Sequence, residues 1–196
     1  MALVEGTNCG FVAAAPVADP GETAFPSNTG FACTSRFTSP AGNNIVTELG
    51  WWQHGDAHVA ANFNMGIYAD DGSGDPGSLI ATQNSGSETT ENTPEWCVYS
   101  GLNITILPST VYHLAFAVDA IVSGAHWYEL VWDATQYTNT GDTGASEVLA
   151  DPFVDYGSVT MLMGVYAKYE AVPAFLLMEH SLGGNVLGCN VGRMTE

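Results

Sequence analysis

The feature that most constrains the fold is a repeating pattern of short apolar or alternating runs, separated by turns rich in Gly, Asn, Asp, Ser and Pro. In the run 110–119, one set of alternating positions is apolar: Tyr112, Leu114, Phe116 and Val118. A period of two is typical of a β-strand, because successive side chains point to opposite faces. The sequence shows no long helical period before residue 170. We therefore predict an all-β fold.

The pattern predicts about nine strands, with spacings that suit an antiparallel β-sandwich. They cover residues 30–38, 44–53, 61–69, 78–84, 95–100, 102–107, 110–119, 126–135 and 159–169. The polar stretch 136–157 is expected to form a long loop. We assign residues 1–172 to one sandwich domain.

Residues 173–196 differ from the rest of the chain. Pro173 suits the first turn of a short helix over residues 174–182, and Gly183 and Gly184 would stop it. An apolar, glycine-rich arm would follow. This segment could pack on its own domain or on a neighbouring subunit. The candidate subunit contacts are its apolar side chains, namely Phe175, Leu176, Leu177, Val186 and Leu187.

The charge balance restricts the classes of partner. Arg36, Lys168 and Arg193 are the three basic residues, against 21 acidic ones, for a formal net charge of −18. Nucleic-acid binding needs clustered basic residues that displace counterions from phosphates. An anionic membrane surface would repel this chain for the same reason. We therefore expect neither nucleic acid nor membrane as a partner. The first residues also lack the basic and apolar regions of a secretory leader, so none is expected.

The four cysteines, Cys9, Cys33, Cys97 and Cys189, show no CxxC spacing, which argues against zinc. They could be buried thiols. They could instead form disulfides after release from the cell, and the sequence does not choose among the pairings. Cys9 and Cys189 lie near opposite ends, where a disulfide could join subunits.

One turn carries a candidate calcium site. Asp70, Asp71 and Asp75 place three carboxylates within six residues, and carboxylate oxygens are ligands that Ca²⁺ prefers. The spacing differs from the EF-hand pattern, and a plain acidic turn accounts for the same residues. Apart from this possible calcium, no cofactor is expected.

Two further sets of residues suggest binding sites. His54, Asp56 and His58 would share one side of an extended segment and could hold a transition metal, although a strand exit explains them equally well. The tryptophans could stack on sugars, although most tryptophans in a sandwich pack in the core or at its rim. They are Trp51, Trp52, Trp96, Trp127 and Trp132. Trp51 and Trp52 are adjacent, so we expect one of them to face outward.

Catalysis has little support in the sequence. It contains no Gly-x-Ser-x-Gly elbow, no P-loop and no dinucleotide-binding motif. Glu129 and Asp133 would share a strand face, and two carboxylates can hydrolyse glycosides when one has a raised pKa. Any acidic strand pair would look the same. We therefore expect a protein that is not an enzyme.

The hairpin around the acidic turn supplies a resemblance. It reads Gly66-Ile67-Tyr68-Ala69-Asp70, then Gly74-Asp75-Pro76-Gly77-Ser78-Leu79-Ile80-Ala81. This pattern resembles a hairpin of jelly-roll-like domains in phage structural proteins and bacterial surface proteins. The similarity covers roughly residues 30–120 and implies a jelly-roll-like sandwich. It carries over no catalytic residues.

These observations lead to a hypothesis of function. We expect a virion structural protein, a capsid decoration or cement protein of a tailed phage, made in the host cytoplasm and placed on the virion surface. Its partners would be copies of itself and a major capsid or other virion protein, held by many repeated contacts. The alternative is an extracellular carbohydrate-binding module or surface-fibre subunit. A glycosidase-like enzyme is the third possibility.

Overall fold

The computed structural model of the protein describes residues 3–19, 23–26, 31–53, 60–89, 95–118, 126–131, 138–142, 149–154, 158–159 and 162–172. Within these ranges the fold is all-β, as predicted, and contains no helix. Consequently, no helix in the described part of the chain is long and apolar enough to cross a membrane.

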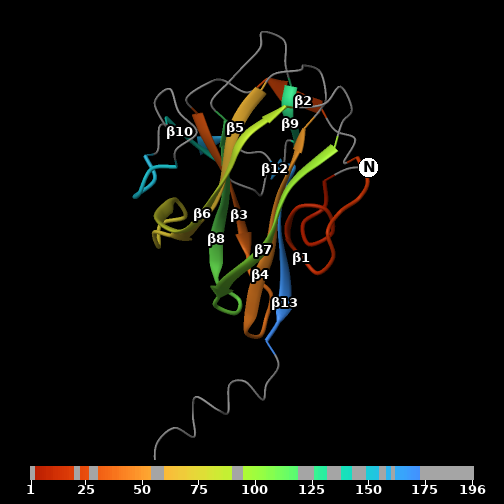
Figure 1. Ribbon diagram of the computed structural model, residues 1–196. Coiled ribbons are helices and arrows are strands. Elements are labelled where there is room, and N and C mark those ends of the chain that lie inside the picture. The colour runs from red at the N-terminus through yellow and green to blue at the C-terminus, as the bar shows by residue number, and fades with distance from the viewer. Residues whose placement is uncertain are drawn as a thin grey trace, which may run out of the picture.

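One main sheet has four strands, in the order β1 (Gly10–Val12), β13 (Val165–Ala171), β4 (Asn44–Gln53) and β7 (Glu95–Ile106). The pairs β13–β4 and β4–β7 are antiparallel, whereas the short edge strand β1 runs parallel to β13. In this register Gly10 lies opposite Tyr166. Residues near the start of the chain therefore lie beside the last described strand (Figure 1).

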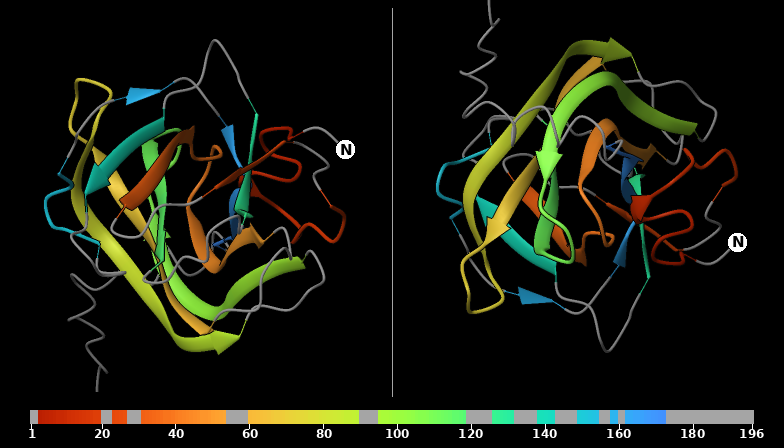
Figure 2. Two further views of the ribbon diagram at one scale, coloured as in Figure 1. Left: turned by 90° about the horizontal axis from the view of Figure 1, so that it is seen from above. Right: turned by 90° about the horizontal axis from the view of Figure 1, so that it is seen from below.

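The other main sheet has six strands, in the order β11 (Ser158–Val159), β10 (Thr138–Asp142), β3 (Phe31–Thr38), β8 (Val111–Val118), β5 (Ala60–Asp70) and β6 (Pro76–Thr89). All of its pairs are antiparallel. A small third sheet joins β12 (Leu162–Met163), β9 (His126–Val131) and β2 (Thr23–Pro26). Figure 2 views this arrangement from above and from below, with the N-terminal loops at its margin.

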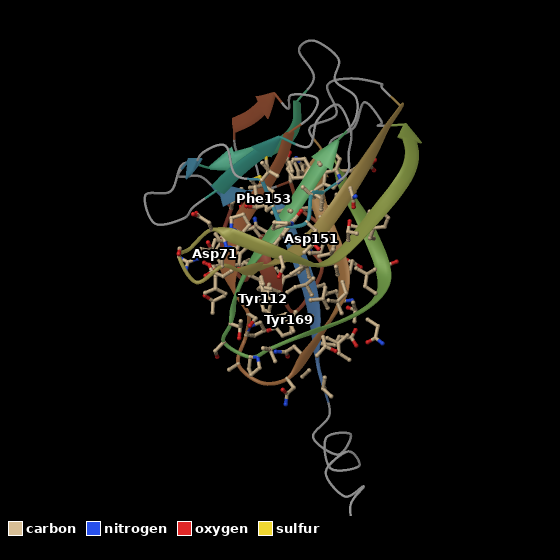
Figure 3. The ribbon with its side chains drawn as sticks, turned by 90° about the vertical axis from the view of Figure 1, so that its left-hand side faces the viewer. Asp71, Tyr112, Asp151, Phe153 and Tyr169 are labelled. Atoms are coloured by element: carbon tan, nitrogen blue, oxygen red, sulfur yellow. The ribbon has the colours of Figure 1, made fainter. Side chains whose placement is uncertain are left out.

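The main hydrophobic core lies between the two large sheets, as in a β-sandwich. Trp51 of β4 stacks on Phe116 of β8, with ring centroids 5.3 Å apart and planes 9° from parallel. Phe11 of β1 meets Tyr112 of β8 edge to face at 6.0 Å. Each such pair contributes about 0.5–1.5 kcal/mol beyond the area it buries. These aromatic pairs hold the two sheets together, and Figure 3 labels Tyr112 and Tyr169 in this region.

A second, smaller core covers the opposite face of the six-stranded sheet. It contains Ala32, Tyr68, Ala115, Ala117, Leu149 and Phe153. The alternation predicted for residues 110–119 is therefore confirmed, since Tyr112, Leu114 and Phe116 enter the main core. The opposite face of the same strand is also buried: His113, Ala115 and Ala117 are all fully inaccessible. A strand covered on both faces is a central strand of the domain.

Some strand predictions were wrong. The predicted strands 95–100 and 102–107 form the single strand β7, in which Gly101 has a φ of +76° and the register shifts opposite Thr47. This bulge keeps Cys97 and Tyr99 on the core side before it, and Leu102 and Ile104 on that side after it. Conversely, the predicted strand 159–169 is interrupted and contributes to β11, β12 and β13.

The predicted loop 136–157 contains a strand that the sequence pattern did not indicate. β10 pairs with β3 from Thr138, opposite Ser35, to Asp142, opposite Phe31. Its sequence, Thr-Asn-Thr-Gly-Asp, has no apolar alternation. Backbone pairing with a long neighbour forms this strand, because a ladder of main-chain hydrogen bonds does not depend on apolar side chains. The strands β1 and β2 were also missed, because runs of three and four residues are too short to show a period of two.

Candidate functional site

The acidic turn between β5 and β6 is closed by its own hydrogen bonds. The Asp71 carboxylate accepts the amides of Ser73 at 2.7 Å and Asp75 at 3.2 Å. The Asp71 amide donates to the carbonyl oxygen of Asp75 at 2.9 Å, and the Gly72 amide donates to Asp70 Oδ1 at 2.9 Å. Two of the three candidate calcium ligands therefore stabilise the turn itself.

Asp70 also joins a charged cluster on the outer face of the six-stranded sheet. Its Oδ2 lies 3.3 Å from Arg36 Nε of β3 and 3.2 Å from His113 Nε2 of β8. The His113 side chain is fully buried, whereas that of Asp70 is 15% exposed. Strands β3, β8 and β5 are neighbours in the sheet, so three distant parts of the sequence meet here. We call these residues the Arg36–Asp70–His113 cluster.

The cluster shifts the pKa values of its members. Burial lowers the pKa of His113, and this effect outweighs the hydrogen bond and charge of Asp70, which favour the protonated ring. For Asp70, burial favours the protonated carboxyl. The Gly72 amide, the His113 ring and the Arg36 charge together outweigh it and lower the pKa of Asp70. At neutral pH the cluster therefore holds a neutral imidazole against an Arg–Asp ion pair.

Residues 149–154 form a strap across the hairpin of β5 and β6. The Tyr68 hydroxyl donates to the carbonyl oxygen of Ala150 at 2.7 Å, and the Leu79 amide donates to Asp151 Oδ1 at 3.0 Å. The Phe153 ring meets the Tyr68 ring edge to face at 5.2 Å. Figure 3 shows Asp151 and Phe153 against this hairpin, with Asp71 at its turn.

A glycine in β5 permits the close approach of the strap. A Cβ atom at Gly66 would stand 2.5 Å from Leu149 Cδ1 and 3.0 Å from the carbonyl oxygen of Ala81. Together the strap and the cluster cover the outer face of β8, where His113, Ala115 and Ala117 are buried. In the described part of the chain, no three His, Cys, Asp or Glu side chains gather as a metal site would require. Calcium at Asp70, Asp71 and Asp75 stays a prediction of the sequence.

An aromatic cluster lies on the outer face of the four-stranded sheet. Trp96 of β7 meets Trp52 of β4 at 5.2 Å and Tyr166 of β13 at 5.1 Å, both edge to face. The Tyr166 hydroxyl donates to Glu48 Oε1 at 2.6 Å. Burial, and secondarily this contact with Glu48, raises the pKa of Tyr166. The Trp96 indole nitrogen donates to the carbonyl oxygen of Ala18 at 3.2 Å.

The prediction that either Trp51 or Trp52 faces outward was half right. Their side chains do take opposite faces of β4, but Trp51 is fully buried and Trp52 is only 3% exposed. Trp52 is covered because Trp96 packs against it. Neither ring is available to stack on a sugar. Trp96 is half-buried, with its edge contacts and its indole nitrogen already engaged.

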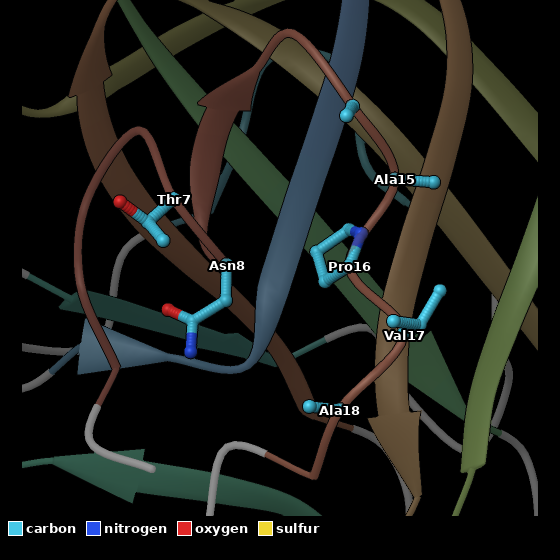
Figure 4. A pocket seen from close by; sticks show the side chains of 7 residues that line it. Thr7, Asn8, Ala15, Pro16, Val17 and Ala18 are labelled. Atoms are coloured by element: carbon cyan, nitrogen blue, oxygen red, sulfur yellow. The ribbon is translucent and has the colours of Figure 1, made fainter.

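A pocket of about 220 Å³ lies between two parts of the N-terminal segment. It is lined by Thr7, Asn8, Ala14, Ala15, Pro16, Val17 and Ala18. Figure 4 shows Thr7 and Asn8 on one side of it and residues 15–18 on the other. Two hydrogen bonds to Val4 fix Asn8 in this loop. The side-chain Oδ1 of Asn8 accepts the Val4 backbone amide at 2.6 Å, and the backbone amide of Asn8 donates to the Val4 carbonyl oxygen at 3.1 Å. We call this the N-terminal pocket.

The lining of the N-terminal pocket is mostly apolar and carries no charged side chain, although Glu5 and Asp19 flank it in the sequence. Val17 on its lining is 94% exposed, and Val4 in the same segment is 48% exposed. Residues 6–18 include no acidic or basic side chain. Exposed apolar surface rimmed by polar residues is typical of a contact site.

The described cysteines are buried thiols. Cys9, Cys33 and Cys97 form no disulfide with one another, and each is buried in the main core. Burial and the charge of Glu5 raise the pKa of Cys9 to about 12. A thiol with this pKa and no exposed surface reacts slowly. Cys9 therefore could not join subunits through a disulfide unless the N-terminal segment opened.

Several predicted residues lie outside the described residues. They are His54, Asp56, His58, Trp132, Asp133 and Cys189, together with the contact residues Phe175, Leu176, Leu177, Val186 and Leu187. The predicted helix 174–182 lies there too. Trp127 and Glu129 belong to β9, but the structure does not describe their side chains.

Sequence reasoning missed both the Arg36–Asp70–His113 cluster and the N-terminal pocket. One signal for the cluster was present: His113 is a polar side chain in the most regular alternating run of the chain. The charge-free run 6–18 was no signal for the pocket, because the longer run 96–118 is also free of charged side chains.

Comparison of the sequence with protein-family models and with curated proteins finds no match.

Proposed function

We propose that this chain is a structural subunit that works by surface contact, and that it assembles on a virion as a capsid decoration protein. The observation that carries the proposal is the exposed, mostly apolar lining of the N-terminal pocket, which contains no charged side chain. Copies of a protein with a net charge of −18 repel one another. At physiological ionic strength, salt screens this repulsion beyond about 8 Å. Contacts between copies are least costly where no acidic side chain lies.

The hairpin that carries the family resemblance also supports the proposal. β5 and β6 pair from Ala60, opposite Thr89, to Asp70, opposite Pro76, and the acidic turn joins them. The strap and the charged cluster brace this hairpin on its outer face. A jelly-roll-like sandwich with a braced hairpin suits a subunit that must keep its shape in a lattice. The jelly-roll topology is part of the proposal.

The experiment measures self-association of the full chain by mass photometry and analytical ultracentrifugation over a range of concentrations. Burying a valine side chain contributes about 1.5–3 kcal/mol, so V17E is expected to weaken association by roughly 10–150-fold. The control is L107E, because Leu107 is 62% exposed and follows β7, away from the pocket. A wild-type chain that stays monomeric at every concentration would refute assembly through self-contact.

A further inference from the structure

The size of the N-terminal pocket limits what can occupy it. Pockets that bind drug-sized ligands measure about 300–1,000 Å³. At about 220 Å³, this pocket is smaller than that range. Its lining is mostly alanine, proline and valine side chains. These dimensions and this chemistry suit one or two large apolar side chains of a polypeptide.

The low charge of residues 173–196 suggests that this segment supplies those side chains. Residues 173–196 hold only three charged side chains, Glu179, Arg193 and Glu196, and so account for −1 of the formal net charge of −18. The same segment carries the apolar run Phe175, Leu176 and Leu177. A nearly uncharged segment can approach a charge-free pocket without the repulsion that separates the acidic bodies.

Chain length decides whether Phe175 could come from the same copy. The pocket residues Thr7 and Asn8 directly precede β1, whose Gly10 is level with Tyr166 of β13. Val172 follows six residues later and is bonded through its amide to the Asn43 carbonyl oxygen. Those six residues of strand span about 20 Å. The three residues from Val172 to Phe175 span at most about 11 Å, so Phe175 does not reach the Thr7 and Asn8 side of the pocket in its own copy.

We propose that the N-terminal pocket receives Phe175 and its apolar neighbours from the C-terminal segment of a second copy of this chain. The inference deepens the proposed function, on which it rests, by naming the contact. Exchanged reciprocally, the contact closes a dimer. Passed from head to tail, it builds a ring or a filament.

The test uses the full-length chain and a matched pair of substitutions. A14W fills the pocket, because Ala14 lines it, whereas A13W places the same ring on an exposed neighbour that does not line it. Both alanines are exposed, so neither substitution disturbs the core. A14W is expected to weaken self-association at least tenfold, and A13W by less than threefold. F175D, in the segment, is expected to match A14W.

Mixing the two defective variants provides the decisive measurement. A14W keeps a working segment and F175D keeps a working pocket. Each alone is expected to be monomeric, and a 1:1 mixture is expected to form a species of twice the chain mass. Because the remaining pocket and segment are both disabled, this species cannot grow further.

The outcomes separate this inference from the proposed function. If the wild-type chain assembles while A14W assembles equally well, the pocket is not the contact and only the inference fails. The same holds if A13W is as damaging as A14W, or if the mixture stays monomeric. If the wild-type chain never assembles, the proposed function fails with it.

Discussion

The indole nitrogen of Trp96 donates a hydrogen bond to the carbonyl oxygen of Ala18 at 3.2 Å, although the two residues are 78 positions apart in the sequence. Ala18 lines the N-terminal pocket, and Trp96 lies in β7 of the four-stranded sheet. One wall of the pocket is therefore tied to the rigid part of the fold. A contact surface held in place in this way loses less conformational entropy on binding.

Replacing Trp96 with Phe tests this tie. The substitution removes the hydrogen bond and keeps an aromatic ring beside Trp52 and Tyr166. A hydrogen bond of this kind contributes about 0.5–1.5 kcal/mol, so W96F is expected to weaken self-association by roughly 2–10-fold. Sedimentation equilibrium measures the change. V98A is the control, because Val98 is an exposed residue of the same strand. Equal association of W96F and wild type would contradict the role of this tie.

The Arg36–Asp70–His113 cluster predicts a dependence of stability on pH. The folded state lowers the pKa of His113 from 6.5, so the unfolded chain binds that proton more readily. The contribution of His113 to the free energy of unfolding therefore has its maximum above pH 6.5. It falls as the pH drops toward the pKa of His113 in the folded state, by at most about 1.4 kcal/mol per pH unit. The lowered pKa of Asp70 adds a further loss below about pH 3.8.

Urea unfolding between pH 5 and 7.5 measures this slope in the wild-type chain and in H113Q. The variant lacks the imidazole, so its stability is expected to change less over this range, whatever its absolute value. E170Q, at an exposed position of β13, is the control and should keep the wild-type slope. A wild-type stability that rises on acidification from pH 7 to pH 5 would show that the sign is wrong.

Gly50 is predicted to be intolerant of any side chain. A Cβ atom there would stand 2.3 Å from Cε1 and 2.5 Å from Cζ of Tyr166, whose ring is fully buried. G50A is therefore expected to lower the free energy of unfolding by about 1–3 kcal/mol, as overpacking does. In the control G77A, the added Cβ would meet no atom closer than 3.4 Å. Thermal and urea unfolding compare the two, and equal losses would show that the Tyr166 ring yields freely.

Cys9 is predicted to resist modification in the folded protein. Its thiol is inaccessible and its pKa is raised to about 12, so little thiolate forms at neutral pH. Maleimide labelling followed by peptide mass mapping should leave Cys9 unmodified until the chain is unfolded in urea. Labelling within minutes under native conditions would mean that the N-terminal segment opens readily. In that case an intermolecular disulfide through Cys9 would become feasible.

Local side-chain patterns determined much of the fold. β4 was predicted with the observed bounds, 44–53, and β8 within one residue at each end, because their apolar alternation is a property of neighbouring residues. The acidic turn at residues 70–77 was recognised from its own composition. Burial of both faces of β8 could not be predicted in this way, because the strap that covers its outer face comes from residues 149–154.

The tertiary structure alone decided which distant residues meet. Arg36, Asp70 and His113 come from three strands, and only the order β3–β8–β5 brings them together. β10 exists because β3 offers it a backbone ladder. The N-terminal pocket depends on a parallel pairing of β1 with β13 and on the bond from Trp96 to Ala18. The alternation of apolar and polar residues indicates which face of a strand is buried. The pairing of strands that are far apart in the sequence depends instead on the packing of the whole chain.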